Sequence, residues 1–232
     1  MAGITGAGIR RGDILLCKSY SLLPTTTHLV IRAGQFAGQV LGGNAPLGES
    51  NTVHAQIALS TGQTPASIAE SDGSGLHVGT CTVEADVFRL GDASLRKVAD
   101  TAAQVAEDLV AKTTGTAGGH YNRMRSAFSI VRFLYYGSKA KQLDQQVDEG
   151  TYTDGYYCSM FVTVCYQVAA LRCNIPVPTI LNGDAMNMSP SDLESYLNAF
   201  SNTWTFVGTL NLPSGDAWDR WRQRVFSREH SH

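Results

Sequence analysis

Apolar and polar residues alternate in several short stretches of the first hundred residues. Val53, Ile57 and Leu59 occupy odd positions in the segment 52–59, which is the two-residue period of a half-buried strand. Similar short apolar runs, bounded by glycine, proline and polar turn residues, predict further strands at 14–17, 66–70 and 76–83. These segments indicate a sheet of antiparallel strands.

The hydrophobic period changes beyond residue 90. Apolar residues at 95, 98, 102, 105 and 109 fall three and four apart, which predicts an amphipathic helix with Asp92 or Ser94 as its N-cap. The segment 158–172 is apolar on nearly all sides, as expected of a helix at the centre of a fold, and we expect 174–178 to end it. Further elements are expected as a helix over 123–136, a short helix that starts at Ser189-Pro190, and a last strand over 203–210.

Composition limits the class of protein. The chain has 232 residues, of which 43% are hydrophobic and 16% charged, and its formal net charge is −2. A near-neutral chain without a dense basic block argues against nucleic acid as a partner, and the apolar content argues against disorder. We expect one α+β domain over 1–232, with flexible ends at 1–10 and 227–232.

Targeting and cofactor signals are weak. No apolar run approaches the ~20 residues of a membrane helix, and the first residues lack the apolar stretch of a signal peptide. Five scattered cysteines favour synthesis in a reducing compartment such as the cytoplasm, with later export by a signal-independent machine left open. Because no nucleotide or metal motif with the required spacing occurs, we expect no cofactor and no metal.

Cys158 is the strongest candidate for chemistry. It stands at the start of the expected buried helix, after the turn-like segment 153–155. The unpaired N–H groups and the positive dipole end of a helix favour the thiolate, which is the nucleophilic form of cysteine. The alternative is that Cys158 is a small core residue, the role expected of Cys165 and Cys173.

A nucleophilic cysteine needs a base and a group that orients the base. His54 lies on the 52–59 strand, which would fix the direction of its ring, and Glu70 ends the next strand and could accept the other ring N–H. His28 is the main rival base, because residues 27–31 also read as a strand with a histidine. His77 and His120 are further rivals, and a surface position is the alternative for each of these residues.

The order of these motifs resembles the permuted branch of the NlpC/p60 papain-like superfamily, the YiiX/YaeF-like proteins, which are related to lecithin:retinol acyltransferase. Two departures are a longer stretch between Asp13 and His54 and a valine at position 53, where the family usually has serine. The matching segments are Arg11-Gly12-Asp13-Ile14-Leu15-Leu16, Val53-His54-Ala55-Gln56-Ile57-Ala58-Leu59, Ile68-Ala69-Glu70-Ser71 and Tyr157-Cys158-Ser159-Met160-Phe161-Val162.

The resemblance implies a papain-like fold in which Cys158 is the nucleophile, His54 the base and Glu70 the orienting residue. The implied reaction is cleavage of an amide through a thioester, with the Cys158 backbone N–H and the hydroxyl of Tyr20 or Tyr157 as candidate oxyanion donors. Peptidoglycan peptides are the expected substrate. Without a signal peptide, such an enzyme could be an antibacterial effector with a cognate immunity protein. The alternatives are a lipid or protein acyltransferase or thioesterase on the same fold, and an inactive binding module.

Overall fold

The computed structural model describes residues 3–18, 52–72, 74–113, 145, 157–185 and 188–211. The expected helix over 123–136, the tail 227–232 and the candidates Tyr20, His28 and His120 lie outside these residues. Within them the protein combines one sheet with four α-helices, which confirms the prediction of mixed α and β structure.

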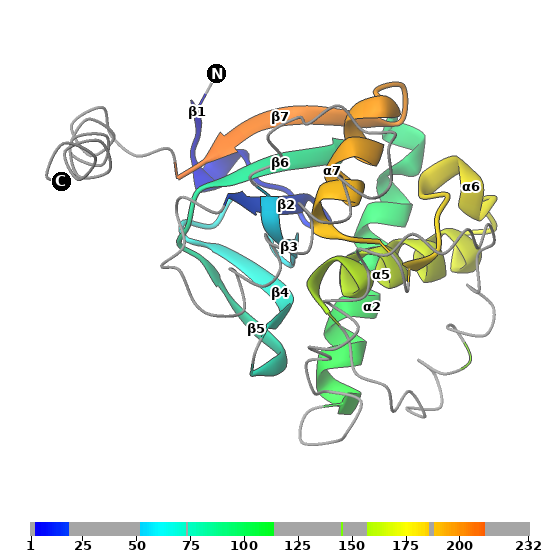
Figure 1. Ribbon diagram of the computed structural model, residues 1–232, viewed down its shortest axis with the longest axis horizontal. Coiled ribbons are helices and arrows are strands. Elements are labelled where there is room, and N and C mark those ends of the chain that lie inside the picture. The colour runs from blue at the N-terminus through cyan, green and yellow to red at the C-terminus, as the bar shows by residue number, and fades with distance from the viewer. Residues whose placement is uncertain are drawn as a thin grey trace, which may run out of the picture.

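Seven strands form the sheet, in the order β1-β7-β6-β2-β3-β4-β5 (Figure 1). Neighbouring strands pair in antiparallel fashion except β1 and β7, which are parallel. The strands are β1 (Gly3–Ile4), β2 (Ile14–Lys18), β3 (Thr52–Ala58), β4 (Ala66–Asp72), β5 (Gly75–Cys81), β6 (Ala85–Leu90) and β7 (Trp204–Leu210).

Four α-helices lie together beside the sheet (Figure 1). The segment between β6 and the first of them is a 3-10 turn, η2 (Ala93–Leu95), whose N-cap Asp92 accepts a hydrogen bond from the Ser94 N–H. The helices are α2 (Arg96–Thr113), α5 (Cys158–Arg172), α6 (Val177–Ile180) and α7 (Pro190–Ala199). None of the helices in the described part of the chain is long and apolar enough to cross a membrane.

The sheet must curl, because β5 and β6 are joined by only the residues 82–84 although β4, β3 and β2 stand between them. Four strand spacings in a flat sheet amount to about 19 Å, whereas four residue steps of extended chain reach about 14 Å. Consistent with this curl, the Asn211 amide at the end of β7 donates hydrogen bonds to the carbonyls of Cys81 and Val83.

The curl buries both faces of the sheet. Ile14, Leu16, Ala55 and Ile57 face α2 and α5 and belong to the larger core. Residues that point to the other face of the sheet form a second, smaller core, which contains Leu15, Cys17, Ala58, Ile68, Cys81 and Val87.

Gly12 fixes how closely the helices approach the start of β2. Its φ is +82°, and a Cβ at this position would lie 2.3 Å from the carbonyl oxygen of Ala99 on α2. The Tyr166 hydroxyl on α5 donates a hydrogen bond to the Gly12 carbonyl. Both helices therefore contact the backbone of one glycine, where any other residue would be strained and would clash.

Lys18 joins α7 to the opposite end of β2. Its ammonium lies 2.7 Å from carboxylate oxygens of both Asp86 on β6 and Glu194 on α7. Because Lys18 is only 8% exposed, these two carboxylates offset the free-energy cost of burying its charge. The N-terminus of α7 carries a capping box between Ser189 and Asp192, as its sequence suggests.

Two parts of the sequence prediction need correction. The strand β6 was not expected, because a register shift between Val87 and Phe88 breaks the alternation that would reveal it. Residues 174–178 were expected only to end a helix, yet the short helix α6 follows directly at Val177. Residues 3–10 contribute β1 and the 3-10 turn η1 (Gly6–Gly8), which are too short to leave a periodic pattern.

A buried ion pair between β2 and β6 is expected to contribute strongly to stability. Asp13 is 1% exposed, and its two carboxylate oxygens accept hydrogen bonds of 2.8 and 2.7 Å from Nε and Nη2 of Arg89. Asp13→Asn should lower the free energy of unfolding in urea by about 3 kcal/mol, because it leaves the guanidinium without its charged partner. Asp100→Asn, which removes an exposed pair with Arg96, should change it by less than about 0.5 kcal/mol. Equal effects of the two variants would contradict this assignment.

Candidate active site

The site is built around the imidazole of His54. The side chain points away from the helix-facing residues Ala55 and Ile57, and it is 9% exposed. Its Nε2 lies 2.6 Å from Oε2 of Glu70 on β4. Because Nε2 is engaged in this way, Nδ1 is the ring nitrogen that remains for an interaction with Cys158.

Glu70 is held by two donors on β3. The Gln56 side-chain amide donates a 2.8 Å hydrogen bond to the same Oε2 that contacts His54. Burial favours the protonated acid, but the hydrogen bond and charge of His54 and the hydrogen bond from Gln56 outweigh it, so that the pKa of Glu70 falls to about 2. The carboxylate therefore stays ionised at neutral pH.

The strands β3 and β4 part just beyond this contact. Their pairing ends at the Gln56–Glu70 pair, although β3 extends back to Thr52 and β4 continues to Asp72. The N–H groups of the first part of β3 are thus not used by β4. The Cys158 sulfur lies at this place, close enough to the His54 ring and to the backbone at Ala55 for both to lower the pKa of the thiol.

Cys158 is the first residue of α5, and its side chain is buried at 1% exposure. Tyr157 precedes it as an N-cap in extended conformation that supplies no side-chain hydrogen bond, so the first-turn N–H groups of α5 are not capped from that position. One of them, at Ser159, interacts with the Cys158 sulfur.

The protonation states of Cys158 and His54 depend on the charges around them. Burial disfavours the Cys158 thiolate, but the charge and hydrogen bond of His54 and the two backbone hydrogen bonds lower the thiol pKa below its usual value. Burial likewise disfavours the imidazolium, but the Cys158 thiolate and Glu70 together raise the pKa of His54 to about 10. Each group thus shifts the other toward the charged form, which is the direction of a thiolate–imidazolium pair.

Cys165 and Cys17 lack this environment. Burial raises the pKa of Cys165, seven residues further along α5, above its usual range. A hydrogen bond with Cys81, together with burial, does the same for Cys17. These thiols belong to the apolar cores and are poor nucleophiles.

The structure thus brings Cys158, His54 and Glu70 into one connected set. Gln56 was not among the predicted site residues, although the alternation of β3 places it on the same face as His54 and could have indicated it. His77, considered as a rival base, lies on the far side of Glu70, with its Nε2 3.3 Å from Oε1.

Of the two tyrosines considered as oxyanion donors, only Tyr157 lies within the described residues, and its hydroxyl is engaged elsewhere. The Tyr157 hydroxyl donates a 3.1 Å hydrogen bond to the carbonyl of Ala185, in the core. Tyr20 lies outside the described residues. The backbone N–H of Cys158, at the start of α5, is the remaining candidate from the sequence analysis.

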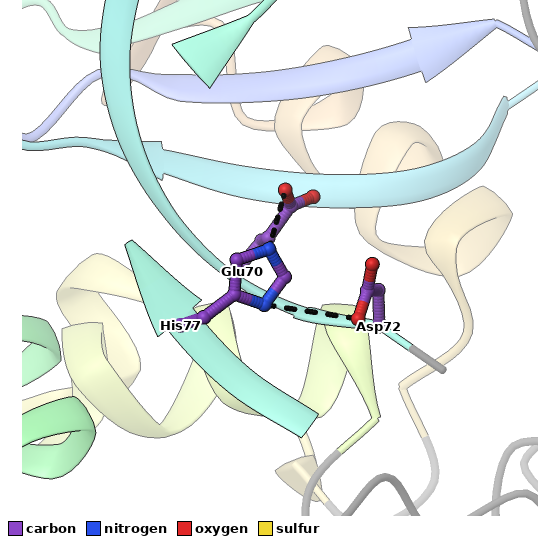
Figure 2. A group of neighbouring side chains, drawn as sticks. All are labelled: Glu70, Asp72 and His77. Atoms are coloured by element: carbon purple, nitrogen blue, oxygen red, sulfur yellow. Dashed lines mark ion pairs between the residues drawn. The ribbon is translucent and has the colours of Figure 1, made fainter. Parts of the chain in front are cut away.

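Glu70 also belongs to a cluster of side chains of the types that bind metal ions. Glu70, Asp72 and His77 each offer one ligand atom, and these atoms lie within 4.8 Å of one another (Figure 2). They are the only residues of this kind found together among the described positions.

Comparison with protein-family models, with curated proteins and with solved structures finds no match for this chain. Interpretation of the site therefore depends on its geometry and on the chemistry of its residues.

The protonation of the pair can be measured without access to the buried thiol. A thiolate absorbs near 240 nm, so the difference in absorbance between the wild type and Cys158→Ala reports the ionisation of Cys158 alone. We expect this difference to be present at pH values below the ordinary thiol pKa of ~8.5. In a His54→Ala background the same difference should appear only at higher pH, because the charge that stabilises the thiolate is gone. A difference that titrates at the same pH in both backgrounds would contradict the pairing.

Proposed function

We propose that this protein is a cysteine hydrolase that cleaves amide bonds, with Cys158 as nucleophile, His54 as base and acid, and Glu70 as the orienting residue. The observation that carries the proposal is the continuous set of contacts from the sulfur through the imidazole to the carboxylate. Thiol, imidazole and carboxylate in this order are what nucleophilic catalysis by cysteine requires.

In the proposed reaction the Cys158 thiolate attacks the substrate carbonyl carbon and forms a C–S bond. The Cys158 backbone N–H stabilises the resulting oxyanion. As the C–N bond breaks, the His54 imidazolium gives its proton to the leaving amine and becomes a neutral base. His54 then accepts a proton from water as the water attacks the thioester, which releases the acid and returns the thiolate.

Glu70 acts through His54. Its Oε2 fixes the ring orientation by the 2.6 Å contact with Nε2, which leaves Nδ1 directed to the sulfur. Its negative charge also stabilises the imidazolium of the resting pair. Gln56 holds the carboxylate in place through the 2.8 Å hydrogen bond to the same oxygen.

The finer fold assignment is part of the proposal. A papain-like arrangement of the permuted type has its sheet first and its nucleophile helix later in the chain. The position of α5 after six of the seven strands, with Cys158 at its start beside β3, supports this assignment. The substrate class that accompanies the resemblance is the peptide part of peptidoglycan, and we propose it as the substrate.

The experiment that tests the function uses purified peptidoglycan fragments. The wild type should release new free amino groups and a matching pair of shorter products, which mass spectrometry assigns to one amide bond. Cys158→Ala should abolish the release and leave the thermal midpoint nearly unchanged. Cys165→Ala is the matched control, because it removes a buried thiol from the same helix away from His54 and should keep activity. Full activity of Cys158→Ala would rule out the covalent mechanism.

The pH profile tests the role of Glu70. Because the charge pair requires a protonated His54, whose pKa is about 10, the alkaline limb of the rate should lie near that pH in the wild type. Glu70→Gln removes the charge that stabilises the imidazolium. The limb should therefore move to lower pH, and the maximal rate should fall about tenfold or more.

Glu107→Gln is the control for this profile, because it changes a carboxylate of the same type that pairs with Arg11 near the surface. Its pH profile should match that of the wild type. If the alkaline limb of Glu70→Gln lies at the same pH as that of the wild type, Glu70 does not act on His54.

A further inference from the structure

Glu70 lies between two histidines and uses a different oxygen for each. Its Oε2 contacts the His54 ring and the Gln56 amide, on the side of Cys158. Its Oε1 faces Nε2 of His77 at 3.3 Å, on the side of β5. The register of the β4–β5 hairpin pairs Glu70 directly with His77, so the two side chains are neighbours on one face of the sheet.

His77 presents a lone pair to this carboxylate whenever its ring is neutral. Its Nδ1 lies 3.2 Å from the carbonyl oxygen of Gly75, which can only accept, so Nδ1 carries the hydrogen. In the neutral ring that tautomer leaves Nε2 without a hydrogen, opposite Oε1 of Glu70. Two acceptors that face each other repel unless a cation or a proton lies between them.

The spacing of these two atoms fits a metal ion. Zn–N and Zn–O bonds of about 2.0 to 2.2 Å at a tetrahedral angle place the two ligand atoms about 3.3 to 3.5 Å apart. The observed separation between Nε2 and Oε1 is 3.3 Å.

Asp72 supplies a third ligand of the right type. It ends β4 beside His77, as Figure 2 shows, and its Oδ1 is 3.7 Å from Nδ1 of that ring. Its Oδ1 accepts hydrogen bonds from the backbone N–H and the hydroxyl of Ser74, so Oδ2 is the oxygen left to bind an ion held by Glu70 and His77. The side chain is 43% exposed, which leaves room for the rotation that this requires. One imidazole and two carboxylates form a donor set that zinc accepts, with a fourth position left for water.

We propose that Glu70, His77 and Asp72 form a Zn²⁺ site on the outer side of the proposed catalytic carboxylate, and that zinc bound there inhibits the enzyme. The site itself stands on the geometry of the β4–β5 hairpin. The inhibition rests on the proposed function. A divalent cation on Oε1 offsets the negative charge that Glu70 presents to His54 through Oε2, while the inner hydrogen bonds remain possible.

Binding is tested by calorimetry with zinc chloride on the Cys158→Ala protein, in which the thiol cannot act as a ligand. We expect saturation at about one equivalent of zinc. In the same background His77→Ala should weaken the affinity at least about tenfold, and Asp72→Asn should weaken it less.

Asp108→Asn, a partly buried aspartate on α2 away from the hairpin, should leave zinc binding unchanged. All three variants should have thermal midpoints near that of the parent protein. If His77→Ala is unstable, Asp72→Asn still tests the site, because position 72 is exposed. Absence of zinc binding, or binding that neither variant weakens, overturns the site.

Inhibition is tested separately on the protein that retains Cys158. Micromolar zinc should inhibit amide hydrolysis by the wild type and inhibit His77→Ala at least about tenfold less effectively. Equal inhibition of both would place the inhibitory ion on Cys158 and His54 and overturn the regulatory role. If the wild type hydrolyses no amide, the proposed function fails, whereas the calorimetric result still decides the zinc site.

Discussion

A buried imidazole between a thiol and a carboxylate is the constraint on which the site depends. His54 is almost excluded from solvent, and burial alone would hold its ring neutral. The charge of Glu70 on one side and of Cys158 on the other reverses that preference. Each of the three groups therefore owes its protonation state to its neighbours, and removal of one changes the other two.

The backbone creates the space for this arrangement. Because β3 and β4 stop pairing beyond Gln56 and Glu70, the start of α5 can reach the backbone of β3, and the Cys158 sulfur interacts with the backbone at Ala55. A fully paired β4 would use those N–H groups and cover the edge. The same divergence carries β4 and β5 outward as a hairpin, which leaves Oε1 of Glu70 accessible to His77.

Local sequence pattern was sufficient for the elements that carry the site. Alternation indicated the strand that bears His54, and the apolar run after Cys158 indicated the central helix. The bulge in β6 and the two-residue strand β1 have no such pattern, because their positions are determined by pairing with β7. Pattern alone could not give the contact of Gln56 with Glu70 or the position of His77, since both depend on strand register.

The proposed catalysis depends on His54 being an imidazolium that is paired with the Cys158 thiolate. The most direct measurement is the pH dependence of the ¹⁵N chemical shifts of the two His54 ring nitrogens. Both nitrogens should stay protonated at about pH 8 and titrate near 10, and they should titrate at clearly lower pH in Cys158→Ala. A ring that titrates near the ordinary ~6.5 in the wild type, with no change in Cys158→Ala, would contradict it.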